Sequence, residues 1–154
     1  ALQGVHRTWL APDGQDKAAV DTPRRAMGHL LGNAVRIAPA DQTLVLGEGI
    51  ETMLSVREAA PSLPVWAALS SGHLGAVLLP DGLQRLYIAI DRDPAGQRAA
   101  ERLTARATEA GIAVRVLEPR LGDFNDDLRA HGAEALRQHL AQQIDLKDQH
   151  RLTI

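Results

Sequence analysis

Residues 85–98 constrain the fold of this chain more than any other stretch, because they combine a strand signal, an acidic turn and the start of a helix. An apolar run at residues 86–90 predicts a buried strand that ends at Asp91 and Asp93. Side chains along a strand alternate between its two faces, so we expect the two aspartates to point the same way. Pro94 and a long amphipathic run then predict a helix, and a strand–turn–helix unit of this kind is typical of open α/β sheets.

The aspartate pair itself supports two interpretations. In the first, Asp91 begins an aspartate-rich turn and Asp93 caps the helix that follows. In the second, the two carboxylates hold a divalent cation, because anions this close repel each other unless positive charge lies between them. A carboxylate pair at the carboxyl end of a strand also lies where open parallel sheets bind their ligands. The choice depends on which other side chains reach the same edge.

Strand and helix signals alternate regularly over the central and C-terminal parts of the chain. Apolar runs predict strands at residues 43–46, 63–69, 85–90 and 113–117. Helical spacing predicts helices at residues 50–60, 95–110 and 133–144, with a short helix opening near residue 70. The alternation predicts an α/β fold, in which a Rossmann-like four-stranded parallel sheet is flanked by helices.

The first forty residues follow a different pattern. A strand signal at residues 5–11, a Pro-Asp-Gly turn and a weaker strand signal at residues 17–20 predict a small lobe that contains a β-hairpin. The chain starts at Ala1 without Met, which suggests a fragment of a longer protein. We expect an N-terminal lobe at residues 1–40, a main domain at residues 41–145 and a polar tail or truncated linker at residues 146–154.

The charge distribution limits how this chain can hold a polyanion. The formal net charge is −2, although residues 1–40 carry five arginine and lysine residues against three acids. A chain this acidic does not bind nucleic acid by bulk charge, so such binding needs a local basic patch or bound metal ions. Arg24 and Arg25 are the candidates for a phosphate-contacting surface, and the alternative is a solvated loop.

Composition excludes several other classes of site. The chain has no cysteine, which rules out disulfides and thiolate zinc sites and fits a cytoplasmic location. Aromatic residues make up 3%, so stacking platforms for bases are scarce. No apolar run approaches the roughly 20 residues that span a bilayer, so a membrane is not an expected partner.

Acidic residues follow three of the four predicted strands. In chain order they are Glu48, then Asp91 and Asp93, then Asp123, Asp126 and Asp127. Because parallel strands end at one edge of the sheet, we expect these carboxylates to converge there. Their repulsion predicts a bound divalent cation, and ligation by oxygen alone favours Mg²⁺ or Mn²⁺. Such ions bridge carboxylates and phosphates, which indicates phosphoryl or nucleotidyl transfer.

Two motifs carry a resemblance to a known family. Leu-Val-Leu-Gly-Glu-Gly at residues 44–49 and Ile-Asp-Arg-Asp at residues 90–93, followed by Pro-Ala-Gly, resemble the Toprim domain. That domain is shared by bacterial-type primases, two types of topoisomerase, overcoming-lysogenisation-defect nucleases and recombination mediators. Gly-Asp-Phe-Asn-Asp at residues 122–126 also resembles the Lys-Asp-x-Asn-Asp element of phage and plasmid primases, with Gly122 where lysine is common.

The resemblance implies roles for particular residues. It places Glu48, Asp91 and Asp93 in catalysis, with Glu48 acting on a hydroxyl or a leaving oxygen. The implied metal ligands are Glu48, Asp91, Asp93, Asp123 and Asp126. The candidate contacts to substrate or nucleic acid are Arg24 and Arg25 of the lobe and Arg98, about one turn into the helix after Asp93.

The function that the resemblance implies is the catalytic core of a plasmid- or phage-type DNA primase. Such a core makes RNA primers on single-stranded DNA from nucleoside triphosphates, beside a helicase domain or protein. A Toprim nuclease using the same acids, and a non-catalytic Toprim module that binds DNA or a partner, are the alternatives. A topoisomerase is disfavoured, because Tyr87 lies inside a predicted strand and no nucleophilic tyrosine module is present.

Overall fold

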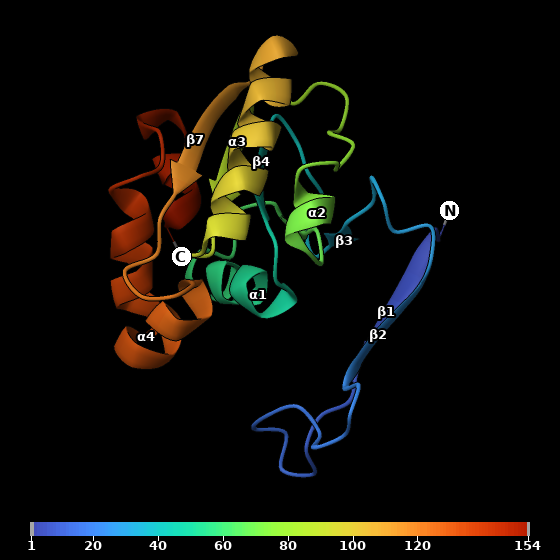
Figure 1. The fold of residues 1–154 in the computed structure, drawn as a ribbon. Coiled ribbons are helices and arrows are strands. Elements are labelled where there is room, and N and C mark those ends of the chain that lie inside the picture. The colour runs from blue at the N-terminus through green and yellow to red at the C-terminus, as the bar shows by residue number, and fades with distance from the viewer. Residues whose placement is uncertain (1, 154) are drawn as a thin grey trace.

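The structure is a computed structural model that describes residues 2–153, and Figure 1 shows the arrangement of its elements. Within this range, five strands form the main sheet in the spatial order β3-β5-β4-β6-β7. They are β3 (Val35–Arg36), β4 (Thr43–Gly47), β5 (Val65–Ala67), β6 (Arg85–Ala89) and β7 (Ala113–Leu117). Strands β4 to β7 pair in parallel, which confirms the predicted α/β fold with its four parallel strands. The antiparallel β3 adds an edge strand that is too short to produce a periodic signal.

Helices cover both faces of this sheet. One face packs against α1 (Ile50–Ala59) and α4 (Phe124–Ala141), and the other against α2 (Ser71–Leu74) and α3 (Pro94–Glu109). Alternation along the central strands decides which side chains enter each core. Val45 and Tyr87 join the α1–α4 core, whereas Leu46 and Ile88 join the α2–α3 core. Because both faces are covered, β4 is buried along its whole length, as its unbroken apolar run predicts.

Two predicted elements differ from the structure. The second strand of the lobe is β2 (Arg24–Gly28), which pairs antiparallel with β1 (Gly4–Thr8); residues 17–20 contribute a single bridge between Lys17 and Leu10. All residues of β2 are exposed, so no hydrophobic alternation marks it as a strand. The last main helix begins at Phe124 instead of residue 133, because Asp123 caps it, and it is interrupted at Gly132, which has a φ of 80°.

The C-terminal segment is folded against the sheet. Residues Leu146–Leu152 form a 3₁₀ helix, η1, and Leu152 enters the α1–α4 core. The fully buried Asp148 accepts hydrogen bonds from the Tyr87 hydroxyl (2.8 Å) and from Nε of Arg85 (2.6 Å). The segment expected to be a polar tail or truncated linker thus makes specific contacts with the main sheet over residues 146–152. The division into a lobe at residues 1–40 and a main domain at residues 41–145 stays a prediction.

The β1–β2 pair forms a separate two-stranded ribbon, which stands beside the main body of the molecule in Figure 1. Its two strands are joined by a long loop at residues 9–23. Among residues 2–153, none of the helices combines the length and apolar character that crossing a membrane requires.

Candidate active site

Three parallel strands end at the same level of the sheet. Gly47 at the end of β4 is the register partner of Ala89 at the end of β6, and Ala89 is the partner of Leu117 at the end of β7. Glu48 therefore leaves the sheet beside Asp91, and the loop at residues 118–123 leaves it on the other side of Asp91. The backbone N–H of Arg92 donates to the carbonyl oxygen of Gly122 (2.8 Å), which ties that loop to the aspartate turn.

Asp91 lies at the centre of the predicted acidic cluster. Its burial, followed by the negative charges of Glu48, Asp123, Asp93 and Asp126, raises its pKa from 3.8 to about 6. Its Oδ1 atom is buried and has no hydrogen-bond partner among the described residues. The structure thus brings all five sequence-predicted carboxylates within electrostatic reach of one another at this edge.

Glu48 is held between two glycines at the end of β4. A side chain at position 47 would collide with Met53 and would lie 3.0 Å from the carbonyl oxygen of Ala89, so glycine allows β4 to end close against β6. Burial raises the pKa of Glu48; the backbone amide of Ser71 opposes this rise, and the charge of Asp93 adds to it. Glu48 is therefore easier to protonate than an ordinary glutamate.

Asp93 and Asp123 both cap helices, so the capping interpretation of the aspartate turn is correct for Asp93. One oxygen of Asp93 accepts from the backbone N–H groups of Ala95 (2.8 Å) and Gly96 (2.7 Å) at the start of α3. One oxygen of Asp123 accepts from the backbone N–H of Asp126 (2.8 Å) at the start of α4. Each carboxylate keeps a second oxygen outside its cap, so capping and ligation are compatible for both residues.

Asp127 has a structural role, in contrast to its acidic neighbours. It is buried, and its two oxygens accept from the backbone N–H groups of Arg120 and Leu121, each at 2.8 Å. These bonds fix the loop that carries Asp123. Gly122 in the same loop gives Asp126 room, because a side chain at position 122 would lie 2.8 Å from Oδ2 of Asp126.

We call the sheet edge that carries Glu48, Asp91, Asp93, Asp123 and Asp126 the carboxylate edge. Its oxygen donors suit a hard divalent cation, but the described side chains do not surround a single ion position. Among residues 2–153, no three acidic or histidine side chains are arranged as a ready metal-binding group. The donors are all oxygens, the buried Oδ1 of Asp91 lacks a partner, and four neighbouring anions raise the pKa of Asp91. A cation would satisfy that oxygen and offset the repulsion, after rotation of side chains toward it.

The candidate nucleic-acid contacts do not form one cluster. Arg24 forms an ion pair with Glu51 in the first turn of α1, whereas its neighbour Arg25 is exposed. The pKa of Glu51 is lowered overall. Burial acts to raise it, but a backbone hydrogen bond and the Arg24 guanidinium together outweigh burial. Arg98 is exposed on α3 and makes no ion pair with another described residue.

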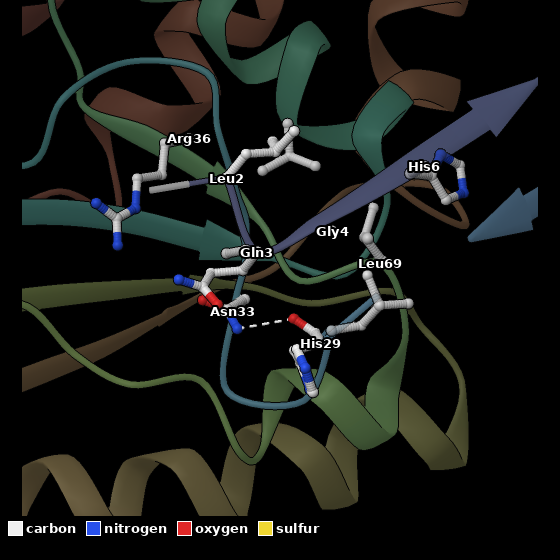
Figure 2. A pocket seen from close by; sticks show the side chains of 11 residues that line it. Leu2, Gln3, Gly4, His6, His29, Asn33, Arg36 and Leu69 are labelled. Carbon is white, nitrogen blue, oxygen red and sulfur yellow. Dashed lines mark hydrogen bonds between the residues drawn. The ribbon is translucent and has the colours of Figure 1, made fainter. Parts of the chain in front are cut away.

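Leu69 connects the carboxylate edge to a pocket, and the sequence gives no signal for this role. It follows β5 and has a φ of 78°, in the left-handed region that favours glycine. Its backbone N–H donates to the carbonyl oxygen of Glu48 (2.8 Å). Its side chain lines a pocket of about 540 Å³ between the ribbon and β3, together with His6, His29 and Arg36 (Figure 2). None of the described residues that line this pocket is acidic.

Comparison with protein families identifies the class of this chain. A model of the Toprim domain matches residues 43–134, which is more than half of the chain, so the chain belongs to the Toprim domain family. Residues 1–37 match a domain of unknown function. No curated protein sequence matches the chain.

Solved structures extend the likeness to primases. The primase fragment of the bacteriophage T7 primase-helicase protein superposes with a TM-score of 0.65 at 20% identity, over 92% of this chain and 62% of the fragment. The chain thus spans less than two thirds of that fragment. The zinc-binding and RNA polymerase domains of the Aquifex aeolicus primase superpose with a TM-score of 0.48 at 24% identity, over 68% of this chain and 27% of that one. The family model therefore confirms the predicted Toprim family, and the T7 fragment shows a shared fold.

Proposed function

We propose that this chain is the catalytic domain of a DNA primase, which joins nucleoside triphosphates into a short RNA primer on single-stranded DNA. The convergence of Glu48, Asp91, Asp93, Asp123 and Asp126 on one sheet edge carries the proposal. The fold shared with the phage primase fragment supports it. That phage protein is a primase-helicase, which also supports a helicase domain or protein as the partner.

In this proposal the carboxylates hold Mg²⁺ or Mn²⁺ against the triphosphate. Asp91 and Asp93 are the principal ligands, with Asp123 and Asp126 completing the site from the neighbouring loop. When bound, the cation supplies positive charge to the phosphates and to the leaving pyrophosphate. The neighbouring carboxylates that raise the pKa of Asp91 repel one another, and a bound cation gains affinity because it relieves this repulsion.

Glu48 is proposed to accept the proton from the attacking 3′-hydroxyl. That oxygen forms a bond to the α-phosphorus of the incoming nucleotide, and the bond from this phosphorus to the β-phosphate bridging oxygen breaks. A carboxylate with a raised pKa is a better proton acceptor than an ordinary glutamate, which suits Glu48 to the role. Arg98, exposed in the second turn of α3, is the proposed contact for the substrate phosphates, and Arg24 and Arg25 are proposed contacts for the template.

A single incubation distinguishes the primase from the nuclease. The protein is mixed with single-stranded DNA, labelled nucleoside triphosphates and Mg²⁺ or Mn²⁺, and both primer and template are resolved by length. We expect labelled products shorter than the template, and their loss in Asp91→Ala plus Asp93→Ala. Shortened template without labelled product would identify a nuclease, and neither change would support a non-catalytic module.

A matched control keeps the test specific. Asp81 is an exposed acid in the turn before β6, at the opposite edge of the sheet from Asp91. Asp81→Asn should leave primer synthesis unchanged. Manganese binding, followed by the electron spin resonance of the free ion, gives a second readout that does not depend on turnover.

A further inference from the structure

One face of the β1–β2 ribbon points away from the other described elements. Along β1, Val5 and Arg7 are exposed, whereas Gly4, His6 and Thr8 are half-buried. This alternation means that the ribbon turns one face toward the main body and the other toward solvent. We call the second face the outward face; it consists of Val5, Arg7, Trp9, Arg25 and Met27.

The outward face concentrates positive charge without local compensation. Arg7 and Arg25 are direct cross-strand partners, and like charges placed opposite each other destabilise an antiparallel pair. Within residues 2–153, neither arginine makes an ion pair. In the loop at residues 9–23, Asp13 and Asp16 accept hydrogen bonds from the backbone of that loop. This face therefore favours an anionic ligand.

An aromatic ring lies beside this charge. The guanidinium carbon of Arg7 is 3.9 Å from the centroid of the Trp9 ring, and Trp9 keeps 37% of its surface exposed. A planar cation held over an indole presents a flat surface on which an unpaired base can stack, while the arginines contact phosphates. Val5 and Met27, 56% and 75% exposed, supply apolar area next to it.

The opposite face of the ribbon is already occupied. Thr8 and its register partner Arg24 lie on the inward side, where Arg24 pairs with Glu51 of α1. His6 on the same side lines the pocket beside β3. The two neighbouring arginines of β2 therefore have different surroundings, and Arg25 alone is available on the outward face.

We propose that the outward face binds single-stranded nucleic acid, with Arg7 and Arg25 on its phosphates and Trp9 stacked on a base. A single strand is favoured over a duplex because stacking on Trp9 requires an unpaired base. This surface is separate from the carboxylate edge and needs no metal. The proposal rests on the proposed function in its choice of ligand, because a primase acts on single-stranded DNA, and it adds Arg7 and Trp9 to the template contact already proposed for Arg25.

The test measures binding of the whole chain to a fluorescently labelled oligothymidylate by anisotropy, in EDTA and over a range of salt concentrations. Each phosphate contact contributes about 0.7 to the slope of log affinity against log salt for a single strand. Arg7→Ala plus Arg25→Ala should therefore reduce the slope by about 1.4. Trp9→Ala should weaken binding by roughly 5- to 150-fold, the range of one base-stacking contact.

Three comparisons guard against misfolding and general charge effects. Arg129→Ala removes an exposed arginine of α4 that makes no ion pair with another described residue, and it should leave the slope unchanged. Trp9→Phe should retain most of the affinity that Trp9→Ala loses. Circular dichroism of every variant checks that the fold is intact.

The outcomes separate this proposal from the proposed function. Two results would overturn the nucleic-acid proposal: no oligothymidylate binding by the parent chain at low salt, or unchanged binding by the folded Arg7, Arg25 and Trp9 variants. Either result would leave the outward face as a surface for an apolar protein partner. Binding that depends on these residues in a chain that makes no primer would support the outward face and contradict the primase.

Discussion

Among the charged neighbours of Asp91, Glu48 raises its pKa most. The two residues come from different strands, but the register pair Gly47–Ala89 places them side by side at the edge of the sheet. They consequently share their electrostatic environment, so a change at one carboxylate alters the proton affinity of the other.

This relationship predicts the effect of neutralising Glu48. Glu48→Gln removes the largest charge contribution to the raised pKa of Asp91, so that pKa should fall from about 6 toward its ordinary value. Carbon-13 NMR titration of the aspartate carboxyl groups in EDTA measures the change. Glu58→Gln, at an exposed position of α1, serves as the control and should leave the Asp91 titration in place. An Asp91 pKa unchanged by Glu48→Gln would mean that burial and the remaining carboxylates set it without Glu48.

The raised pKa of Asp91 also predicts how stability depends on pH. The folded state binds this proton more tightly than the unfolded state, where the pKa is near 3.8, so the stabilisation from Asp91 is lost as the pH rises through about 6. Without metal, Asp91→Asn should therefore raise the free energy of unfolding at pH 8 by about 1 kcal/mol, a value discounted for partial exposure. Urea denaturation in EDTA at pH 8 and pH 4 measures it; Asp81→Asn should show no such gain.

The sequence specifies the centre of this fold better than its periphery. Strands β4 and β6 are continuous apolar runs that end in Gly47-Glu48 and Ile90-Asp91, so both their burial and the edge they share follow from local pattern. Strand β2 has no apolar alternation, because all five of its residues are exposed. Without the register of β2, the sequence cannot reveal that Arg24 and Arg25 lie on opposite faces of the ribbon.

The candidate site likewise has features that the sequence predicts and features that it does not. Convergence of the acids follows from the sheet topology. The structural role of Asp127, which distinguishes it from Asp126, depends instead on hydrogen bonds set by the path of one loop. The left-handed backbone of Leu69 has no sequence signal, since leucine is not a residue that favours it. The buried position of Asp148 also has no local sequence signal, because it depends on partners more than sixty residues away in the chain, such as Arg85.

Metal binding should stabilise the protein through the carboxylate edge. A ligand that binds only the folded state at about 100 times its dissociation constant adds about 2.7 kcal/mol to the free energy of unfolding. Mn²⁺ in such excess should raise the melting temperature of the parent, and Asp91→Ala plus Asp93→Ala should abolish the rise. Differential scanning calorimetry measures the effect, with Asp81→Asn as the variant that retains it. An equal rise in the double variant would place the ion elsewhere.

The buried Asp148 predicts a large loss of stability at the edge of the sheet opposite the acids. Its carboxylate accepts hydrogen bonds from Thr43, Arg85 and Tyr87, and the guanidinium groups of Arg85 and Arg151 are its ion-pair partners. Asp148→Ala leaves Arg85 and the Tyr87 hydroxyl without this acceptor, so the free energy of unfolding should fall by about 3 kcal/mol.

Urea denaturation of Asp148→Ala beside Lys147→Ala tests this role. Lys147 is the exposed neighbour of Asp148 on η1, and its truncation should change the free energy of unfolding by less than about 0.5 kcal/mol. Because Asp148 contacts the amino ends of β4 and β6, the variant should bind Mn²⁺ with parental affinity under conditions where it remains folded. If Asp148→Ala lowers the free energy of unfolding by less than about 1 kcal/mol, η1 contributes little to the stability of the sheet. If the folded variant binds Mn²⁺ more weakly than the parent, the two edges of the sheet are coupled through β4 and β6.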